Sequence, residues 1–539
     1  MKFTDILRRP TGDEAGRAPS SFTAAQTVSL AGLILLFLLL RWNSFTMPFE
    51  RDEGEYSYSA WLMRQNVMPY EHAFIQKPPM IIYTFMLAQS LSEDSVAIPR
   101  ILAALSVALS TLLVGFIVSR EYGRAAGLSA VWLMTPMMAL RHLLPFAANT
   151  EVFMNAFLLG SLAIYAWKKD QAKSWHWFAA GASGAIAILY KPIAAPVLVF
   201  IFSAWALGAW RSHRSWKALG RSLLMAFSGG LLATLAAISP FLLHDLGASL
   251  WECSGEYNLY FAKVSEPRQN PAMYFLDLFS WNVWLVAALV LWFFVRRPGR
   301  WWLYGGALLV SVVSLVKASH GHYYIMAIPF IVIVCSVSLD GIFRGFPLLF
   351  SRSYTLKTAS VTAVILLSLC WPLRSQVTLS PEELCDRLYT PRNPFVEAPL
   401  VARHVRALTS PGDYVFVAGS EPEILYYAKR RSPSRFITMY PLMIGTPLAE
   451  AYQKEAIREI RSNPPEIIVF ASTPMSWFRQ IGSPPELLDF LDRFAAARYR
   501  IVGGILFDHK EWRDAPGTDE LKKYTLLVFQ RIRGTGPTG

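Results

Sequence analysis

The 539-residue chain contains few charged residues: they make up 17% of it, whereas 53% of its residues are hydrophobic. So little charge excludes an ordinary soluble enzyme of this length and indicates a polytopic membrane protein. Cysteine is scarce as well. None of the four has Cys-x-x-Cys spacing, which predicts neither a zinc site nor a disulfide framework, although Cys253 and Cys385 could pair on an extracytoplasmic face. Gly-x-Gly-x-x-Gly and Gly-x-x-x-x-Gly-Lys-Ser/Thr are both missing, so nothing supports nucleotide binding.

The charge that is present is unbalanced, with a formal net charge of +13. The basic residues form short clusters between long apolar runs and do not make one basic stripe. We therefore interpret them as signals that orient a membrane protein, and we expect membrane lipids, not nucleic acid, as partners.

Apolar stretches that can cross the hydrocarbon core, which takes about 20 residues, recur over the first two thirds of the chain. The first is followed by no small-residue cleavage site, which predicts an uncleaved signal anchor. The predicted spans are 27–46, 97–119, 123–140, 150–167, 175–190, 192–210, 219–242, 272–295, 301–316, 323–340 and 355–373.

The segment 79–92 is short, and the loop charges decide whether it crosses. If the N-terminus is cytoplasmic and 79–92 does not cross, the five basic loops around Arg120, Lys168, Arg211, Arg296 and Arg344 all lie inside. We therefore predict an interfacial or re-entrant helix at 79–92 and about eleven full crossings, in a fold of about 11–13 transmembrane helices. The loops that then face the extracytoplasmic side of the cell (inner) membrane are 47–96, 141–150, 243–271, 317–322 and everything after 375.

The composition changes after the last span, where short apolar strands alternate with helical spacing. The expected strands are Tyr414–Ala418, Arg435–Thr438, Glu466–Phe470 and Tyr524–Phe529, and the expected helices are Glu421–Lys429, Pro447–Ser462 and Pro485–Ala497. This alternation predicts an α/β domain with a largely parallel sheet. The chain would then comprise a cytoplasmic tail (1–26), a transmembrane domain (27–375) whose first loop is 47–96, and an extracytoplasmic α/β domain (376–539).

An acidic cluster opens the first loop, and a lysine closes it. Asp52 and Glu53 follow the first span directly; acidic loop residues usually only cap or solvate, but an ionisable group at a membrane boundary is costly unless it is used. Asp52 could act as the general base on an acceptor hydroxyl or amine. Lys77 precedes Pro78-Pro79, and it is either a snorkelling lysine or the cation that binds a lipid phosphate. Arg100 could assist Lys77.

Further candidate residues lie on the same predicted side. Glu151 stands at the start of a predicted span, where it either favours the helix dipole or belongs to a site. His320 and His322 form a His-x-His pair, but two ligands make a metal site a weak prediction, and contacts with phosphate or sugar are favoured. The other candidate substrate-binding residues are Tyr56, Lys191, Arg268, Lys317 and Tyr323.

The first loop resembles that of the GT-C membrane glycosyltransferases, and most of all that of the protein O-mannosyltransferases and the aminoarabinose transferases of lipid A. The shared pattern is Asp52-Glu53, then Pro69-Tyr70, then Lys77-Pro78-Pro79. The Asn149-Thr150-Glu151 loop, the Tyr190-Lys191-Pro192 turn and the His322-Tyr323-Tyr324…Pro329 segment also look like family features. Asn66 departs from the usual glycine before Pro-Tyr, and Glu53 departs from the commoner aspartate.

The resemblance implies an inverting transfer of a sugar from a polyprenyl-phosphate donor to a lipid, glycan or protein acceptor. Asp52 would then be the base, with Glu53 and Glu151 as further catalytic residues, and Lys77 would hold the departing phosphate. No cofactor and no catalytic metal are expected. The rival functions are a lipid or sugar transporter or flippase, which should show repeat symmetry or matched broken helices, and a polysaccharide polymerase or ligase.

Overall fold

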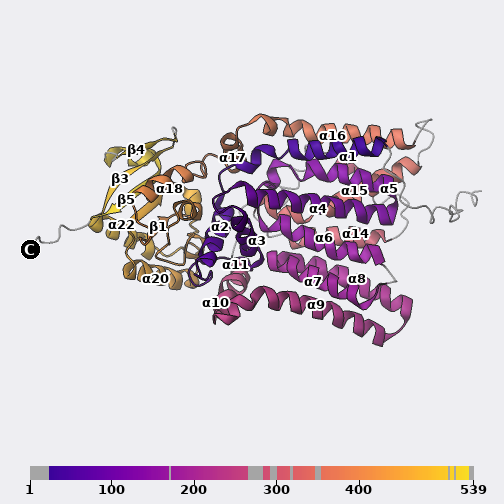
Figure 1. The fold of residues 1–539 in the computed structure, drawn as a ribbon, viewed down its shortest axis with the longest axis horizontal. Helices are drawn as coiled ribbons and strands as arrows, with labels where there is room; N and C mark the ends of the chain where they lie inside the picture. Colours follow the sequence, from indigo (N-terminus) through magenta and orange to yellow (C-terminus); the bar gives the residue numbers. More distant parts are fainter. Residues whose placement is uncertain are drawn as a thin grey trace, which may run out of the picture.

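The computed structural model describes residues 24–168, 172–264, 283–291, 300–315, 320–345, 354–507, 510–514 and 518–532. A bundle of roughly parallel and antiparallel helices forms the larger part, and a smaller α/β part covers one end of it (Figure 1). The predicted tail 1–26 lies almost entirely outside the described residues.

The bundle consists of helices whose sequences are almost uniformly apolar. They are α1 (Ala24–Leu39), α4 (Ala97–Tyr122), α5 (Arg124–Met137), α6 (Thr150–Lys168), α7 (Ser174–Tyr190), α8 (Ala195–His213), α9 (Trp216–Leu243), α13 (Val283–Leu291), α14 (Trp301–Ser314), α15 (Ile328–Gly345) and α16 (Tyr354–Thr378).

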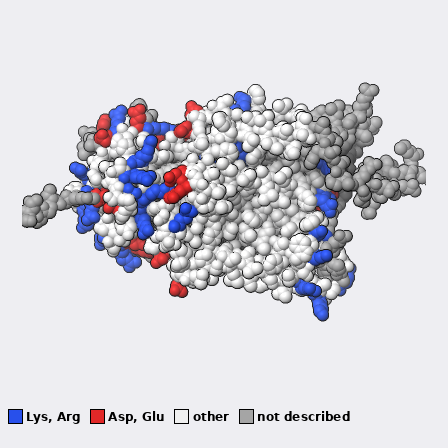
Figure 2. All heavy atoms as spheres, in the orientation of Figure 1, with Lys and Arg blue, Asp and Glu red and all other residues white. Residues whose placement is uncertain are grey.

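The outer surface of the bundle is apolar, as expected for contact with lipid. Leu112, Phe227 and Leu367 are exposed there, and Figure 2 shows a broad belt without charged residues between two charged ends. Within the described residues, five stretches are long and apolar enough to cross a membrane: Thr27–Thr46, Ala97–Tyr122, Thr150–Lys168, Pro192–Ser212 and Trp216–Leu243. The chain is a multi-pass membrane protein.

Each predicted span coincides with a helix, except that 272–295 is represented only by α13, because its remainder lies outside the described residues. The doubtful segment 79–92 forms α3 (Met80–Leu91), which has 12 residues. At about 1.5 Å per residue it is too short to cross the hydrocarbon core, in agreement with the prediction that it does not.

Short elements fill the junction between the bundle and the α/β part. They are α2 (Arg51–Arg64), α3, α10 (Gly247–Trp251) and α11 (Tyr257–Val264), with the short helical turns η2 (Trp42–Thr46), η3 (Arg141–Leu143), η5 (Pro192–Ala194), η6 (Glu252–Glu256) and η7 (Gly321–Met326) (Figure 1). The predicted loop 47–96 therefore contains two helices.

The α/β part has a mixed sheet, which corrects the prediction of a largely parallel one. Its strands are β1 (Val415–Ala418), β2 (Ile467–Ala471), β3 (Tyr499–Leu506), β4 (Trp512–Asp514) and β5 (Tyr524–Arg531), in the order β1-β2-β5-β3-β4. Only β1 and β2 are parallel. The chain returns from β3 to β5 without a crossover helix, which a parallel pair would need.

The helices of this part agree with the three that the sequence predicts and add others. They are α17 (Pro381–Tyr389), α18 (Ala398–Ala407), α19 (Pro422–Ala428), α20 (Pro447–Ser462), α21 (Pro474–Trp477) and α22 (Glu486–Arg498), with the turns η9 (Tyr440–Leu442) and η10 (Thr518–Lys523). The predicted strand Arg435–Thr438 is irregular chain. All four cysteines are free thiols, so Cys253 and Cys385 do not pair.

Helix α2 joins the two parts because both pack on it. A Cβ atom at Gly54 would lie 2.6 Å from the backbone nitrogen of Glu423 in α19, so only glycine permits this approach. The neighbouring Arg51 donates from Nε to the carbonyl of Ser420 at 2.5 Å and pairs with Glu421 at 3.2 Å. The α/β part is thereby held directly over the helix that carries Asp52.

Candidate functional site

The first turn of α2 is fixed by reciprocal capping. Glu50, the N-cap residue, accepts a hydrogen bond from the amide of Glu53 at 3.2 Å, and the Glu53 carboxylate accepts one from the amide of Glu50 at 3.3 Å. This box sets the direction of the helix start. Asp52 lies between the two capping residues, at the positive end of the helix dipole.

Glu53 and Arg100 bind each other in a closed cluster. Both side chains are completely buried, with Arg100 Nε 2.9 Å from Glu53 Oε1 and Nη2 2.5 Å from Oε2. The remaining Arg100 donors reach the carbonyls of Ser44, Met47 and Pro48, and Glu53 also accepts from the amide of Ala148 at 2.8 Å. We predicted Glu53 as catalytic and Arg100 as phosphate-binding, but these contacts fit positioning roles better, because both side chains would first have to leave their partners.

Asp52 differs from Glu53 in being partly exposed and in having no ion pair within 4 Å among the described residues. Burial alone would raise its pKa. Lys77, His322, Lys191 and His320 outweigh that effect, and the pKa of the Asp52 carboxyl is lowered. The carboxylate is therefore ionised at neutral pH. It faces several cationic or titratable groups but forms no direct ion pair with any of the described ones.

The loop before α3 holds Lys77. The phenol of Tyr70 donates to the Lys77 carbonyl at 2.8 Å, Asn258 of α11 donates to the Gln76 carbonyl at 2.7 Å, and Pro78-Pro79 restrict the chain that follows. The Lys77 ammonium has no ion-pair partner within 4 Å in the part of the chain that the structure describes. Burial would lower its pKa, but Asp52 and Glu55 raise it, so the ammonium stays charged.

Backbone geometry explains one departure from the family pattern. Asn66, which stands where glycine is usual, has a φ of 57°. Asparagine tolerates this left-handed conformation better than other residues with a Cβ atom. The turn therefore keeps its shape with Asn66 in place of glycine.

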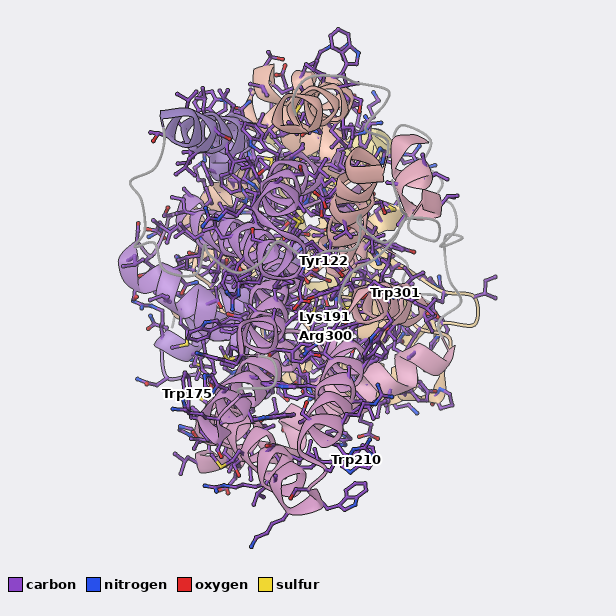
Figure 3. The ribbon with its side chains drawn as sticks, turned by 90° about the vertical axis from the view of Figure 1, so that its right-hand side faces the viewer. Tyr122, Trp175, Lys191, Trp210, Arg300 and Trp301 are labelled. Atoms are coloured by element: carbon purple, nitrogen blue, oxygen red, sulfur yellow. The ribbon has the colours of Figure 1, made fainter. Side chains whose placement is uncertain are left out.

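A second cluster brings together residues that lie far apart in the sequence. Glu151 at the start of α6 pairs with Lys191, at the end of α7, and lies 3.8 Å from His322 Nε2 in η7. The Lys191 ammonium also sits 3.5 Å above the Tyr323 ring centroid. Pro192 forces Lys191 into an extended conformation, which ends α7 at this point. Figure 3 places Lys191 in the interior of the bundle.

His322 is a neutral partner in this cluster. Burial lowers its pKa, and the nearby Lys191 and Lys77 lower it further, against the opposing effects of Glu151 and Asp52. A neutral imidazole can donate one hydrogen bond and accept another.

The structure brings together Asp52, Lys77, Glu151, Lys191, His320, His322 and Tyr323, of the residues that the sequence predicts. Tyr56 lies next to them but is completely buried, with its ring 5.5 Å from that of Phe85, which suits packing of α2 on α3. Arg268 and Lys317 fall outside the described residues. No group of three His, Cys, Asp or Glu side chains converges as metal ligands within the described ranges.

Glu55 is a neighbour that our candidates omitted. It is buried on α2 beside Lys77. Burial raises the pKa of its carboxyl, Lys77 opposes this effect and Asp52 adds to it, and the resulting pKa is about 8. Its place in the Asp52-Glu53-x-Glu55 cluster could have indicated it, but the sequence does not show that Glu55 is buried.

Comparison with known proteins supports the fold. Residues 76–244 match the family described as dolichyl-phosphate-mannose-protein mannosyltransferase. The structure resembles ArnT from Cupriavidus metallidurans bound to undecaprenyl phosphate, with a TM-score of 0.62 and 13% identity, covering 96% of this chain and 100% of that one. The chain has the GT-C fold.

A second relative of known structure has the same fold. It is the oligosaccharyltransferase AglB from Archaeoglobus fulgidus, in complex with an inhibitory peptide and a dolichol-phosphate, with a TM-score of 0.52 and 11% identity over 92% of this chain and 74% of that one. No curated protein matches the sequence. These findings confirm the resemblance to the GT-C enzymes and the predicted fold class; identities this low show the fold and leave the activity to be argued from the site.

Proposed function

We propose that this protein is a membrane glycosyltransferase that transfers a sugar from a polyprenyl-phosphate-linked donor to an acceptor, with inversion at the anomeric carbon. The GT-C fold, the family match over residues 76–244 and the lipid phosphates named with the similar structures support this proposal. The sugar is a hexose or a pentose, and the acceptor is a lipid, a glycan or a protein.

The observation that carries the proposal is the placement of Asp52 beside Lys77. The carboxylate is held in its ionised form, and the ammonium facing it has no ion-pair partner of its own among the described residues. An ionised base next to an unpaired, partly buried cation is a costly arrangement without a ligand, because the cation gives up part of its water and gains no direct partner. An anionic leaving group would supply that partner.

The reaction follows from these two groups. Asp52 accepts the proton of the acceptor hydroxyl or amine as the acceptor atom forms a bond to the anomeric carbon. The bond between that carbon and the phosphate oxygen breaks on the opposite face, and its electron pair leaves with the phosphate. Lys77 stabilises the negative charge that develops on the departing phosphate. Transfer needs no nucleotide sugar and no metal.

Donor binding also tunes the base. Lys77 lowers the pKa of Asp52 in the free protein. A phosphate bound to Lys77 neutralises part of that cationic field, so the pKa of Asp52 rises when the donor is present and the carboxylate becomes a stronger base. The donor thus activates the group that its own transfer requires.

The other residues support these two. Glu151, Lys191, His322 and Tyr323 form one wall, on which neutral His322 can contact a sugar or acceptor hydroxyl. Glu53 and Arg100 fix the start of α2 and so position Asp52. His320 lies on the same side, and its ring centroid is 5.6 Å from that of His322.

We place the site on the extracytoplasmic side. Among the described residues, Arg120, Arg211 and Arg221 lie near the ends of α4, α8 and α9 that face away from the α/β part, and Figure 2 shows Lys and Arg gathered at that end. The positive-inside rule assigns that end to the cytoplasm and therefore places Asp52, Lys77 and the α/β part outside.

The test compares lipid-linked sugars extracted from cells that produce the wild type or Asp52→Asn. The proposal predicts that one polyprenyl-phosphate sugar accumulates in the variant, which names the donor. Asp245→Asn, an exposed aspartate at the end of α9, serves as the control and should not change the pool. An unchanged pool in Asp52→Asn, with the protein present at the wild-type level, would overturn the proposal; a transporter would change where the lipid lies and not its amount.

A further inference from the structure

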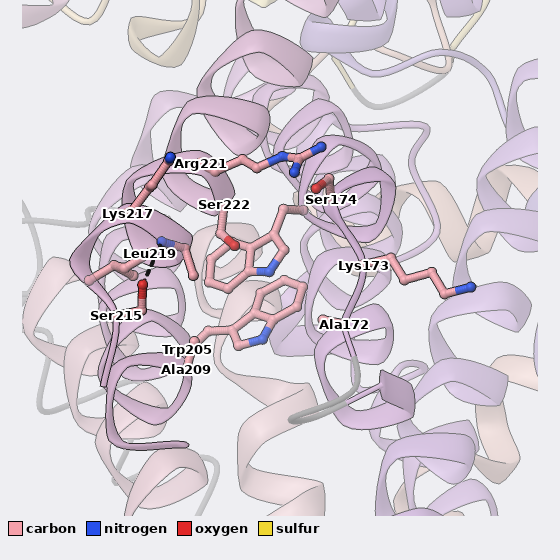
Figure 4. A pocket seen from close by; sticks show the side chains of 12 residues that line it. Ala172, Lys173, Ser174, Trp205, Ala209, Ser215, Lys217, Leu219, Arg221 and Ser222 are labelled. Carbon is pink, nitrogen blue, oxygen red and sulfur yellow. Dashed lines mark hydrogen bonds between the residues drawn. The ribbon is translucent and has the colours of Figure 1, made fainter. Parts of the chain in front are cut away.

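A cavity of about 610 Å³ lies at the end of the bundle opposite the candidate site. It is formed by the start of α7, the last turns of α8 and the start of α9. The polar and aromatic residues that matter here are labelled in Figure 4: Lys173, Ser174, Trp205, Ser215, Lys217 and Arg221. Neither the mechanism above nor the loops near Asp52 use this cavity.

The cavity is strongly electropositive. Lys173, Lys217 and Arg221 line it, and none of the described lining residues is acidic. The first turns of α7 and α9 also border it, and helix N-termini favour anions. In Figure 4, Arg221 extends across the cavity towards Ser174.

Two stacked indole rings form part of its wall. The ring centroids of Trp177 and Trp205 are 3.9 Å apart, with 14° between the ring planes. Trp205 is 2% exposed, and its Nε1 has no hydrogen-bond partner among the described residues. A buried N–H group without a partner is unusual, and an acceptor bound in the cavity could satisfy it.

A second, apolar cavity of about 430 Å³ continues along the same three helices. On α9 the lining passes from Arg221 and Ser222 to Leu223 and Phe227, and on α8 it passes from Trp205 to Phe202. The two cavities together therefore offer a cationic end and a long apolar groove within one continuous stretch of α7, α8 and α9.

Helices α7 and α9 pack closely through glycines, and their small side chains do not fill this groove. A Cβ atom at Gly181 would lie 1.9 Å from the carbonyl oxygen of Ala226, and one at Gly229 would lie 2.0 Å from that of Phe178. The glycines bring the two backbones together and leave small side chains along the groove, such as Gly184 and Ala185.

We propose that this paired cavity binds an anionic membrane phospholipid. Its phosphate lies beside Lys217 and Arg221, near Ser174, and an acyl chain lies in the apolar groove towards the middle of the membrane. Charge and shape both favour this occupant: a free anion would leave the groove empty, and a neutral lipid would place no anion at the cationic end. The cavity lies at the basic end of the bundle, where anionic lipids meet juxtamembrane cations. The proposal does not depend on the proposed activity.

Native mass spectrometry of the full-length protein in mixed micelles tests it, by counting retained phosphatidylglycerol against phosphatidylcholine. The wild type should retain one phosphatidylglycerol in clear preference. Lys217→Gln/Arg221→Gln should lower that retention about tenfold. Arg211→Gln/Arg214→Gln removes the same charge from exposed residues at the same end that do not line the cavity, and should retain the lipid. Equal losses in both double variants, or equal retention of both lipids, would overturn the proposal.

Two further measurements distinguish a phospholipid from a free anion and from a polyprenyl phosphate. Ala185→Phe places a ring in the groove and should weaken retention of phosphatidylglycerol, while inorganic phosphate should not displace the lipid at equal concentration. Displacement by inorganic phosphate, or an unaffected Ala185→Phe, would overturn the role of the acyl chain. Preferential retention of a polyprenyl phosphate that is lost in Lys217→Gln/Arg221→Gln would overturn the assignment to a phospholipid.

Discussion

Asp52 and Glu53 are neighbours in one helical turn, yet they lie in two different environments. Glu53 is completely buried and accepts hydrogen bonds from Arg100 and from the amides of Ala148 and Glu50. Asp52 is partly exposed and feels several cations without a direct ion pair among the described residues. A carboxylate at a membrane boundary can thus stabilise the fold or take part in chemistry. Which of these it can do depends on whether its hydrogen-bond and ion-pair partners are already supplied by the protein.

Removing the charge of Asp52 should have the largest effect on activity. Asp52→Asn keeps the size of the side chain but cannot accept the acceptor proton, so transfer should fall by about 10²–10⁴-fold. Steady-state transfer by the purified protein measures this, with Asp245→Asn as the control. Activity within a factor of three of wild type would show that Asp52 and Glu53 do not differ in the way described.

Removing Arg100 should act on folding instead. Arg100→Gln leaves Glu53 as a buried carboxylate without its cation, which costs about 3–5 kcal/mol. The measurement is thermal unfolding in detergent, where the variant should melt well below the wild type and below Arg141→Gln, which changes an exposed arginine. Normal stability combined with lost donor binding would instead make Arg100 a phosphate ligand.

Neutralising Lys77 should weaken donor binding and change the pH dependence of transfer. A hydrogen bond to a charged group contributes about 1.5–3 kcal/mol, so Lys77→Gln should weaken binding of a prenyl phosphate about tenfold to a hundredfold. Loss of the cation also removes a cause of the low pKa of Asp52. The acidic limb of the rate profile should therefore move to higher pH. Lys454→Gln is the control and should leave the acidic limb in place. An acidic limb that also stays in place in Lys77→Gln would show that Lys77 does not influence the pKa of Asp52.

The smallest effect concerns Glu55, whose pKa is raised to about 8. Its folded-state pKa lies above the unfolded value, so between roughly pH 4.5 and 8 the folded protein binds the extra proton. Stability should fall as the pH rises through this window and level off above it. Glu55→Gln should flatten that slope in melting temperatures, and Glu450→Gln, a control at a half-exposed glutamate, should not. An unchanged slope in Glu55→Gln would show that Glu55 is ionised in the fold.

The sequence predicted much of the bundle because apolar composition alone determines which segments can cross a membrane. It also predicted that Asp52, Lys77, Glu151 and Lys191 lie on one side, since the basic loops orient all of them together. The positive-inside pattern and the first-loop motif thus predicted most residues of the candidate site.

The pairings could not be predicted, because each joins elements distant in the chain. The sequence favours phosphate binding by Arg100, whereas the structure shows its donors on Glu53 and on the carbonyls of Ser44, Met47 and Pro48. The sequence does not predict helix α2, because this helix is buried on nearly all sides and so has no apolar stripe facing a single core. The strand β3 was missed because Gly503 and Gly504 interrupt its apolar pattern.

The most direct test of the account measures the affinity of purified protein for a short-chain prenyl phosphate in wild type, Lys77→Gln and Asp52→Asn. The account predicts that Lys77→Gln binds at least about tenfold more weakly. Asp52→Asn should bind at least as tightly as wild type, because a like charge near the phosphate is removed, while it no longer transfers sugar. Equal affinity in wild type and Lys77→Gln, or weakened binding in Asp52→Asn, would contradict the assignment of Lys77 to the phosphate and Asp52 to the acceptor.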